Sequence, residues 1–345
     1  MTGPAPAAGL SRQQLAGQRV IYSYKGLTPP ASLISLIQHG EAAGVIFFGQ
    51  NISSAAQIAG VIRQLNQANA SPLNPVRAPL LLMTDQEGGV VRRLSGSPTL
   101  SEKQIGAYPL AQAASLATQA GQGAAATLRN VGMNVNLAPV LDVYRQAGDF
   151  DDQYGRSYST NPAVVSALGV NMIKAQQAAG VAATAKHFPG LGAAATSQNT
   201  DARSVTLNIP LATIRSTDEA PFASAIHAGV KLVMVSWAIY PAISAEPAGL
   251  SASVVQGELR NRLHFTGVTV TDAMSAGALG PYGSTQNRTR LAALAGMDLI
   301  LAAAQDVNEG QLAAAELAAA YGGALPSPAF LSSVHRVIAL RQSLK

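Results

Sequence analysis

Eight short apolar runs of strand character recur along the chain, and longer segments with the apolar spacing of helices lie between them. Strands that alternate with helices pair in parallel, because a parallel neighbour is reached only through a crossover connection. The runs are Val20–Tyr24, Val45–Phe48, Leu80–Thr84, Met133–Leu137, Ala182–Lys186, Leu232–Ser236, Val268–Thr271 and Leu299–Ala302. Eight such units predict an α/β fold, a (β/α)8 TIM barrel in a single domain.

The expected helices include Ala56–Asn69, Leu110–Asn130, Pro162–Ala179, Asp218–Ala228, Ala252–Leu263 and Thr289–Ala295. The helix that starts at Asp218 opens with two acidic residues, which favour a helix N-terminus, and Gly229 follows its end, where glycine is common. A doubly wound open sheet is the alternative arrangement of these elements. It requires a glycine-rich phosphate loop after the first strand, and residues Tyr22–Gly26 do not form one.

Composition supports one large core and excludes several classes of protein. Of the 345 residues, 48% are hydrophobic and 12% charged, so we expect residues 11–345 to form one barrel domain behind a flexible tail, residues 1–10. The formal charge of +5 forms no basic stripe with interleaved aromatic residues, which disfavours nucleic-acid binding. No apolar run reaches the roughly 18 residues of a membrane span. We expect a monomer without a membrane-spanning segment.

The sequence contains no cysteine, which excludes disulfides and thiolate metal sites. His39, His227, His264 and His335 have no partner at metal-ligand spacing, so we expect neither a metal nor another cofactor. Residues Met1–Gly9 lack the charged and apolar regions of a signal peptide. The protein is therefore expected to be cytoplasmic, or exported with its signal already removed.

Polar residues follow five of the eight runs, at the strand ends where the active sites of (β/α)8 barrels lie. These residues are Asp85, Asn136, Asp142, Lys186, His187, Ser236, Trp237 and Asp272. We expect their side chains to converge on one rim of the barrel.

Asp272 follows the buried run Val268–Thr271 and precedes a small-residue segment. A carboxylate at the end of a buried strand is desolvated unless a cation faces it. One interpretation is a nucleophile that attacks a sugar carbon to form a glycosyl-enzyme. The other interpretation, equally supported by position, is a cap for a following helix.

The segment Asp85–Arg93 contains a glycine pair that allows a tight turn. Asp85 at its start can accept hydrogen bonds from vicinal hydroxyl groups of a sugar, and Arg93 can donate to an oxygen. A structural ion pair within a turn is the alternative.

Arg156 follows an acidic loop, residues 149–152, and can either donate to a substrate or pair with one of those acids. Lys186 and His187 are adjacent, so both reach a ligand only if the strand ends at or before His187, as Pro189 suggests. A satisfied core histidine is the alternative for His187. The loop that follows ends in Asn199 and Asp201, and a mobile loop of this kind delivers polar side chains to a barrel mouth.

Together these motifs resemble the family 3 glycoside hydrolases, in particular their single-domain β-N-acetylglucosaminidase branch. The resemblance extends over nearly the whole chain and is carried by Asp85–Gly89, Asn136–Val143, Lys186–Gly190 and Thr271–Asp272. It implies Asp272 as nucleophile. It also implies that the sugar before the scissile bond is contacted by Asp85, Arg93, Arg156, Lys186 and His187.

The chain departs from this branch in the loop after Gly190, where the resemblance implies an Asp-x-His dyad that supplies the acid/base. Counted forward from Lys186, the dyad positions hold Ser197 and Asn199. Counted back from Pro221, they hold Asn199 and Asp201, and we prefer this register. Asp201 then becomes the candidate acid/base, since most retaining glycosidases use two carboxyl groups about 5–5.5 Å apart.

Asn199 is expected to hold Asp201 by a hydrogen bond without adding a second charge. Arg203, two residues further on, would oppose an acid role by stabilising the ionised carboxylate. Leu191 and Trp237 stand where the branch has histidines, and both make the rim more apolar. Trp237 is included among the expected sugar contacts.

The leading hypothesis is a retaining exo-β-glycosidase that acts on a β-linked amino sugar or a relative. Asp272 is its nucleophile and Asp201 its acid/base. The alternatives are a sugar-binding protein, a phosphorylase or a weakly active homologue. They arise because the usual Asp-x-His dyad is absent, and a glycosidase without acid/base assistance loses about 10²–10⁴-fold in rate.

Overall fold

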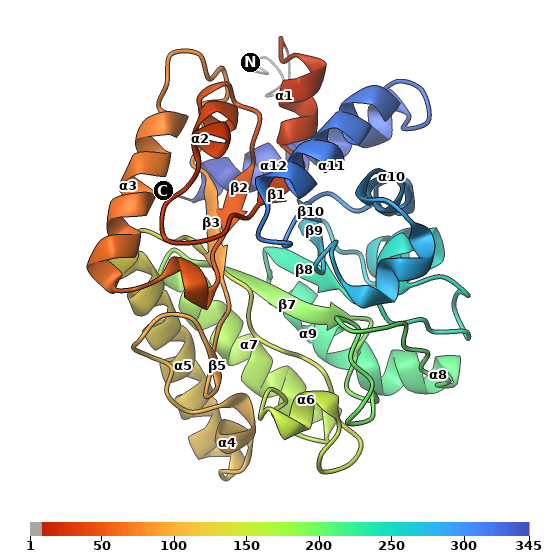
Figure 1. Ribbon diagram of the computed structural model, residues 1–345. Coiled ribbons are helices and arrows are strands. Elements are labelled where there is room, and N and C mark those ends of the chain that lie inside the picture. Colours follow the sequence, from red (N-terminus) through yellow and green to blue (C-terminus); the bar gives the residue numbers. More distant parts are fainter. Residues whose placement is uncertain (1–8, 345) are drawn as a thin grey trace, which may run out of the picture.

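The computed structural model describes residues 9–344, and Figure 1 shows strands surrounded by helices. Eight strands form one sheet in the order β10-β1-β2-β3-β6-β7-β8-β9, and all neighbouring pairs are parallel. They are β1 (Val20–Tyr22), β2 (Gly44–Ile46), β3 (Leu81–Thr84), β6 (Val135–Asn136), β7 (Ala182–Phe188), β8 (Leu232–Val235), β9 (Val268–Thr271) and β10 (Ile300–Leu301). A parallel bridge between Val270 and Leu299 closes the sheet. The predicted (β/α)8 barrel is confirmed.

Helices join these strands and cover the outside of the barrel (Figure 1). The α-helices are α1 (Arg12–Gly17), α2 (Ala31–Gln38), α3 (Ala55–Asn69), α4 (Glu102–Gly106), α5 (Leu110–Val131), α6 (Phe150–Gln153), α7 (Pro162–Ala178), α8 (Leu211–Thr213), α9 (Ala220–His227), α10 (Thr285–Ala295), α11 (Val307–Ala320) and α12 (Ser327–Ser343). Shorter 3-10 turns are η1 (Gly49–Asn51), η3 (Ala248–Leu250) and η5 (Gly277–Tyr282), and π-helical segments are η2 (Ile214–Asp218) and η4 (Ser253–Arg262). None of the helices in residues 9–344 is long and apolar enough to cross a membrane.

All eight predicted strands are present, with boundaries that differ by at most two residues. The helix predicted at 289–295 begins earlier, at Thr285, because the Ser284 hydroxyl accepts a hydrogen bond from the Asn287 N–H and caps it. The helix predicted at 252–263 is π-helical over η4. Most of the expected N-terminal tail, residues 1–10, lies outside the described residues.

The predicted helix Asp218–Ala228 needs a correction at its start. α9 begins at Ala220, and Glu219 occupies its N-cap without a side-chain hydrogen bond. Asp218 is buried at the end of η2, where its carboxylate lies 2.6 Å from the guanidinium of Arg145. Gly229 has a φ of 80° after the helix, as predicted.

Two separate hydrophobic clusters follow the alternation of side chains along the strands. Ile21, Leu81 and Met83 point into the barrel and belong to the interior cluster. Their neighbours on the same strands, such as Val20 and Leu82, pack outward against the helices. Residues of α12 join the interior cluster, so this helix closes one end of the barrel and leaves the other end for the polar rim.

Asp298 fastens the two strands that close the barrel. Its buried carboxylate accepts hydrogen bonds from the Thr269 N–H of β9, 2.9 Å away, and from Arg260, 2.6 Å away. Arg336 lies 2.8 Å from its other oxygen. Burial opposes this charge, but Arg260 and Arg336 outweigh burial and hold the pKa of Asp298 below its usual value.

Asp298→Asn is expected to lower the free energy of unfolding by about 3 kcal/mol, because it leaves two guanidinium groups at the closure without their counter-charge. Glu316→Gln is the control, since Glu316 forms a partly exposed ion pair with Arg290 at 3.6 Å and its loss should cost less than about 1 kcal/mol. Urea unfolding of the three proteins measures both effects. Equal losses would show that Asp298 does not fasten the closure.

Candidate active site

A pocket of about 400 Å³ opens at the carboxyl ends of the strands, where the sequence predicts the rim. Apolar side chains from inside the barrel, including Ile46, Leu137, Met234 and Leu301, contribute to its lining. The structure brings together eight of the nine predicted site residues at this pocket. They are Asp85, Arg93, Arg156, Lys186, His187, Asn199, Asp201 and Asp272.

Lys186 is buried between two carboxylates that follow β3. Its ammonium lies 2.9 Å from Asp85 and 2.7 Å from Glu87, with 2% of its side chain exposed. Burial disfavours these charges, but Lys186 and Arg93 lower the pKa of Asp85 below its usual value, and Arg156 and Lys186 lower that of Glu87 to about 2. The structural ion pair considered for Asp85 is therefore present, and Asp85 lines the pocket as well.

A short antiparallel hairpin, β4 (Gln86–Gly88) and β5 (Val91–Arg92), positions Asp85 and Glu87 beside Lys186. Gly88 and Gly89 have φ angles of 126° and 55°, which favour glycine at both positions. The predicted tight turn thus belongs to a hairpin at the edge of the pocket.

Arg156 forms the ion pair that was considered for it and also faces the pocket. Its guanidinium donates two hydrogen bonds of 2.9 Å to Glu87 and a third of 3.1 Å to Asp151 of the acidic loop. It also lines the pocket. Bidentate pairing fixes the plane of the guanidinium, so its remaining N–H groups have a defined direction.

His187 is oriented by Asp142, which lies beyond β6. The His187 Nδ1 lies 2.7 Å from the Asp142 Oδ2, and the Leu191 N–H donates to the Asp142 Oδ1 at 2.6 Å. Burial opposes both charges, but their mutual attraction raises the pKa of His187 and lowers that of Asp142. His187 is therefore a buried histidine with a satisfied partner that also faces the pocket.

Lys186 and His187 both line the pocket although β7 continues to Phe188, which corrects the expected strand end. The register of β7 against β8 shifts between Ala185 and Phe188, so three residues of β7 match two of its neighbour. Such a bulge turns successive side chains toward one side.

Asp272 follows β9 and lies half-buried in the pocket wall. Its carboxylate accepts a hydrogen bond of 2.7 Å from the Ala273 N–H. The next element in the described chain is the 3-10 turn η5, which starts at Gly277, so the interpretation of Asp272 as a helix cap is wrong.

Asp201 reaches the pocket from the loop between β7 and α8. The Asn199 side-chain oxygen accepts a hydrogen bond from the Asp201 N–H at 2.8 Å, so Asn199 shapes the backbone that carries the carboxylate. Asp201 is exposed at the pocket, but partial desolvation, and then the charge of Asp272, raises its pKa. Arg203 does not oppose this shift, because its guanidinium donates to the Ser197 carbonyl oxygen at 2.7 Å.

This loop is docked against the segment that follows the nucleophile candidate. The Gly277 N–H donates to the Asp201 carbonyl oxygen at 2.7 Å, and the Ala278 N–H donates to that of Thr200 at 2.9 Å. A methyl group at Gly277 would lie 2.3 Å from the Ala202 oxygen, so glycine permits the close approach. The two carboxylates thus sit on hydrogen-bonded loops.

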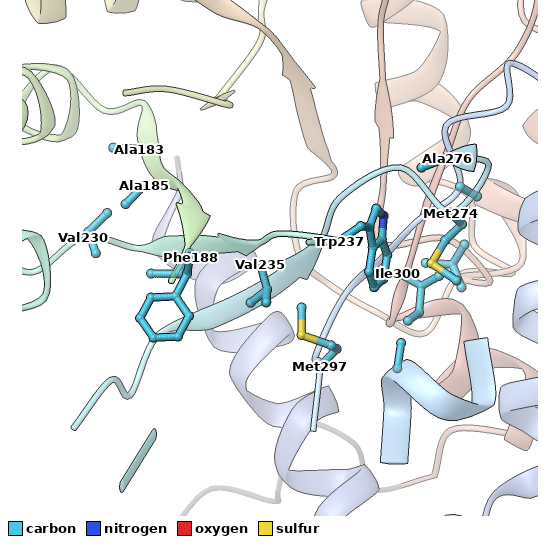
Figure 2. Packing of buried hydrophobic residues seen from close by; sticks show 14 of the residues in the cluster. Ala183, Ala185, Phe188, Val230, Val235, Trp237, Met274, Ala276, Met297 and Ile300 are labelled. Atoms are coloured by element: carbon cyan, nitrogen blue, oxygen red, sulfur yellow. The ribbon is translucent and has the colours of Figure 1, made fainter. Parts of the chain in front are cut away.

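Trp237 is the predicted site residue that the structure places elsewhere, and this is a correction. Its side chain is fully buried and does not line the pocket. Figure 2 shows it among buried side chains that include Met274 and Ile300. Its indole N–H donates to the Ala273 carbonyl oxygen at 2.9 Å, so it supports the segment next to Asp272 from behind.

Glu87 and Asp151 were not predicted as site residues, and Asp142, which was expected at the rim, was not predicted to orient His187. Glu87 and Asp142 lie in motifs noted in the sequence, but their partners became visible only with the barrel assembled. Asp142, Asp151 and His187 place potential metal-ligating atoms within 4.8 Å of one another. Because His187 and Arg156 already hydrogen bond to these acids, we interpret the group as a hydrogen-bonded network.

Asp151 gives this network a pH dependence. Burial, and then the charge of Asp142, raises the pKa of Asp151 to about 7 from an ordinary value of 3.8. Between these values the folded protein keeps a proton that the unfolded chain releases. The contribution of Asp151 to stability is therefore present at low pH and is lost as the pH rises to about 7.

Asp151→Asn keeps an oxygen for Arg156 and removes the ionisation. We expect its Tm, relative to that of the wild type, to be higher at pH 8 than at pH 5. Thermal unfolding of both proteins from pH 5 to pH 8 measures the difference in Tm at each pH. Other titrating groups affect both proteins equally, so their effects cancel in this difference. A difference that does not change with pH would contradict the raised pKa of Asp151.

Comparisons with known proteins agree with this geometry. The profile of the glycosyl hydrolase family 3 N-terminal domain matches residues 14–340. A protein of Arthroderma benhamiae named as an uncharacterized secreted glycosyl hydrolase is 42% identical over 343 residues, which cover 99% of this chain and 96% of that protein. A β-hexosaminidase of Xylella fastidiosa is 34% identical over 283 residues, 80% of each chain.

A solved structure shows the same likeness in three dimensions. The family 3 β-N-acetylglucosaminidase of a Paenibacillus species has a TM-score of 0.88 and 33% identity. The match covers 97% of this chain and 63% of that one, so this chain spans less than two thirds of the Paenibacillus protein.

Proposed function

The chain belongs to glycosyl hydrolase family 3 and is a glycoside hydrolase, and from this premise we propose that it is a retaining exo-β-glycosidase that releases a terminal β-linked N-acetylhexosamine or a close relative. One observation carries the mechanism. Asp201 and Asp272 line the same pocket from two loops that hydrogen bond to each other. Two carboxyl groups with different protonation are what a retaining mechanism requires.

In the first step, the Asp272 carboxylate attacks the anomeric carbon and forms a covalent glycosyl ester. The bond from that carbon to the leaving oxygen breaks, and Asp201 gives its proton to this oxygen, so a neutral alcohol leaves. In the second step, Asp201 takes a proton from water, whose oxygen attacks the anomeric carbon and displaces Asp272. Both carboxyl groups then return to their initial states.

The raised pKa of Asp201 supports its role as the acid. Partial desolvation and the neighbouring charge of Asp272 both favour the protonated form that donates in the first step. Once Asp272 is esterified, it no longer carries a negative charge, so the pKa of Asp201 falls. Asp201 then favours its ionised form, which can act as a base in the second step. The same carboxyl group can therefore serve both steps.

The pocket floor suits the hydroxyl groups of a neutral sugar. Among the described residues, Lys186 pairs with Asp85 and Glu87, which use two of its three N–H groups. One N–H group remains to donate to a substrate oxygen. Arg156 commits three of five N–H groups to acids. Their charges are balanced by these acids, so the remaining donors favour hydroxyl groups over anions.

The names of the relatives support the proposed amino-sugar substrate and the proposed location of the protein. The Xylella and Paenibacillus proteins are named for β-linked N-acetylhexosamine substrates, which supports the same class for this chain. The Arthroderma relative is named as secreted, which favours export over a cytoplasmic location.

Asp272→Ala is expected to lower kcat/KM for an aryl β-N-acetylglucosaminide by about 10⁴-fold or more, because no covalent intermediate can form. Azide should then restore turnover by attacking the anomeric carbon directly and should give the α-glycosyl azide. The anomeric configuration of the product, read by NMR, is the measurement. Wild-type turnover in this variant would end the assignment of Asp272.

Asp201→Ala is expected to lower kcat/KM for a natural β-linked disaccharide by about 10²–10⁴-fold, because its leaving oxygen needs a proton. Formation of the glycosyl-enzyme from a dinitrophenyl glycoside should change far less. Azide should trap the intermediate of this variant as the β-glycosyl azide. Ser197→Ala is the matched control from the same loop and tests the other register of the dyad positions.

Equal losses with both substrates would remove Asp201 from the acid role, and a large loss in Ser197→Ala would favour the other register. Wild-type turnover that requires phosphate and yields a sugar 1-phosphate would make the protein a phosphorylase. An inert wild type would point to a homologue that binds sugar without cleaving it.

A further inference from the structure

Two exposed apolar side chains lie together at the mouth of the pocket. Tyr154 lines the pocket after α6 and is 47% exposed, and Val90 at the tip of the β4–β5 hairpin is 73% exposed. Both flank Ser101. A methyl group at Gly89 would lie 2.6 Å from the Ser101 Cβ, and one at Gly155 would lie 3.0 Å from its Oγ. The hairpin tip and the Tyr154 segment therefore share one side of the rim.

Two contacts hold the Tyr154 ring and the backbone that carries it. It packs edge-to-face on Phe150, with ring centroids 5.7 Å apart and planes at 78°. The preceding residue, Gln153, donates a hydrogen bond of 3.0 Å to the carbonyl oxygen of Thr196, on the loop that carries Asp201. The segment that carries Tyr154 thus lies between the hairpin and the loop that carries Asp201. Its contacts with Phe150 and Thr196 limit its motion.

The lining of the pocket is charged at its floor and apolar at this side of its mouth. Lys186, Arg156 and Asp85 form a charged floor for hydroxyl groups. At the mouth, Tyr154 and Val90 present apolar surface instead. A pyranose carries its hydroxyl groups around its edge and exposes C–H groups on its faces, so an aromatic ring binds it by a face. The terminal sugar fits the floor, and the next sugar along the chain meets the mouth.

We propose that Tyr154, supported by Phe150, binds the leaving-group sugar, the pyranose on the reducing side of the scissile bond. This proposal rests on the proposed function and deepens it. Tyr154 is then a specificity-determining residue that selects a saccharide as the leaving group. Its connection to the Asp201 loop keeps this sugar next to the group that protonates its oxygen.

The test compares a substrate that fills the mouth with one that leaves it empty. N,N′-diacetylchitobiose places a second sugar at the mouth, whereas 2-acetamido-2-deoxy-β-glucosyl fluoride has no leaving sugar and needs little protonation. We expect Tyr154→Ala to lower the ratio of kcat/KM for the disaccharide to that for the fluoride about fivefold, as for loss of one aromatic contact. Tyr154→Phe keeps the ring and should keep the ratio.

Leu110→Ala is the control, because Leu110 is 54% exposed and does not line the pocket. Its ratio should equal that of the wild type. An unchanged ratio in Tyr154→Ala, or equal losses with both substrates, would overturn the leaving-group role. A wild type that cleaves neither substrate would instead overturn the proposed function and this proposal with it, so the two failures are distinguishable.

Discussion

Lys186 lies between Asp85 and Glu87 with 2% of its side chain exposed, and Glu87 also pairs with Arg156 from the loop after β6. A buried charge is stable only when it is paired and hydrogen-bonded. Each member here therefore depends on a partner from a different loop. Removing one charge would leave its partner unpaired, so the loops after several strands are held as one unit at the barrel mouth.

This pairing also determines what the pocket can recognise. A free cluster of Lys186 and Arg156 would attract phosphate or carboxylate groups, but Asp85 and Glu87 offset their charges. What remains is a set of oriented N–H donors and the carboxylate of Asp85, which match the alternating donors and acceptors of a sugar. The cost of burying the charges is thus offset within the protein, and the neutral ligand need not supply a counter-ion.

Local sequence patterns predict the strands, their parallel order and the residues at their carboxyl ends, because alternation with helices leaves few ways to assemble them. Local patterns do not predict the contacts between segments that are far apart in the sequence. The bulge that turns Lys186 and His187 to one side depends on pairing with β8. Trp237 follows a strand like the true rim residues, yet its neighbours in space bury it. Only assembly shows that Asp151 supports Arg156.

A single carboxylic acid can replace a dyad if its surroundings adjust its pKa and its position. Desolvation and the charge of Asp272 raise the pKa of Asp201, which favours the protonated form that the proposed acid role requires. Asn199 fixes the backbone through a neutral amide, since an aspartate there would add repulsion near two acids. Gly277 brings the segment after Asp272 close enough to hydrogen bond with the Asp201 carbonyl oxygen. In the proposed mechanism, the charge of Asp272 therefore contributes to the pKa of Asp201, and the segment after Asp272 helps to place the Asp201 loop.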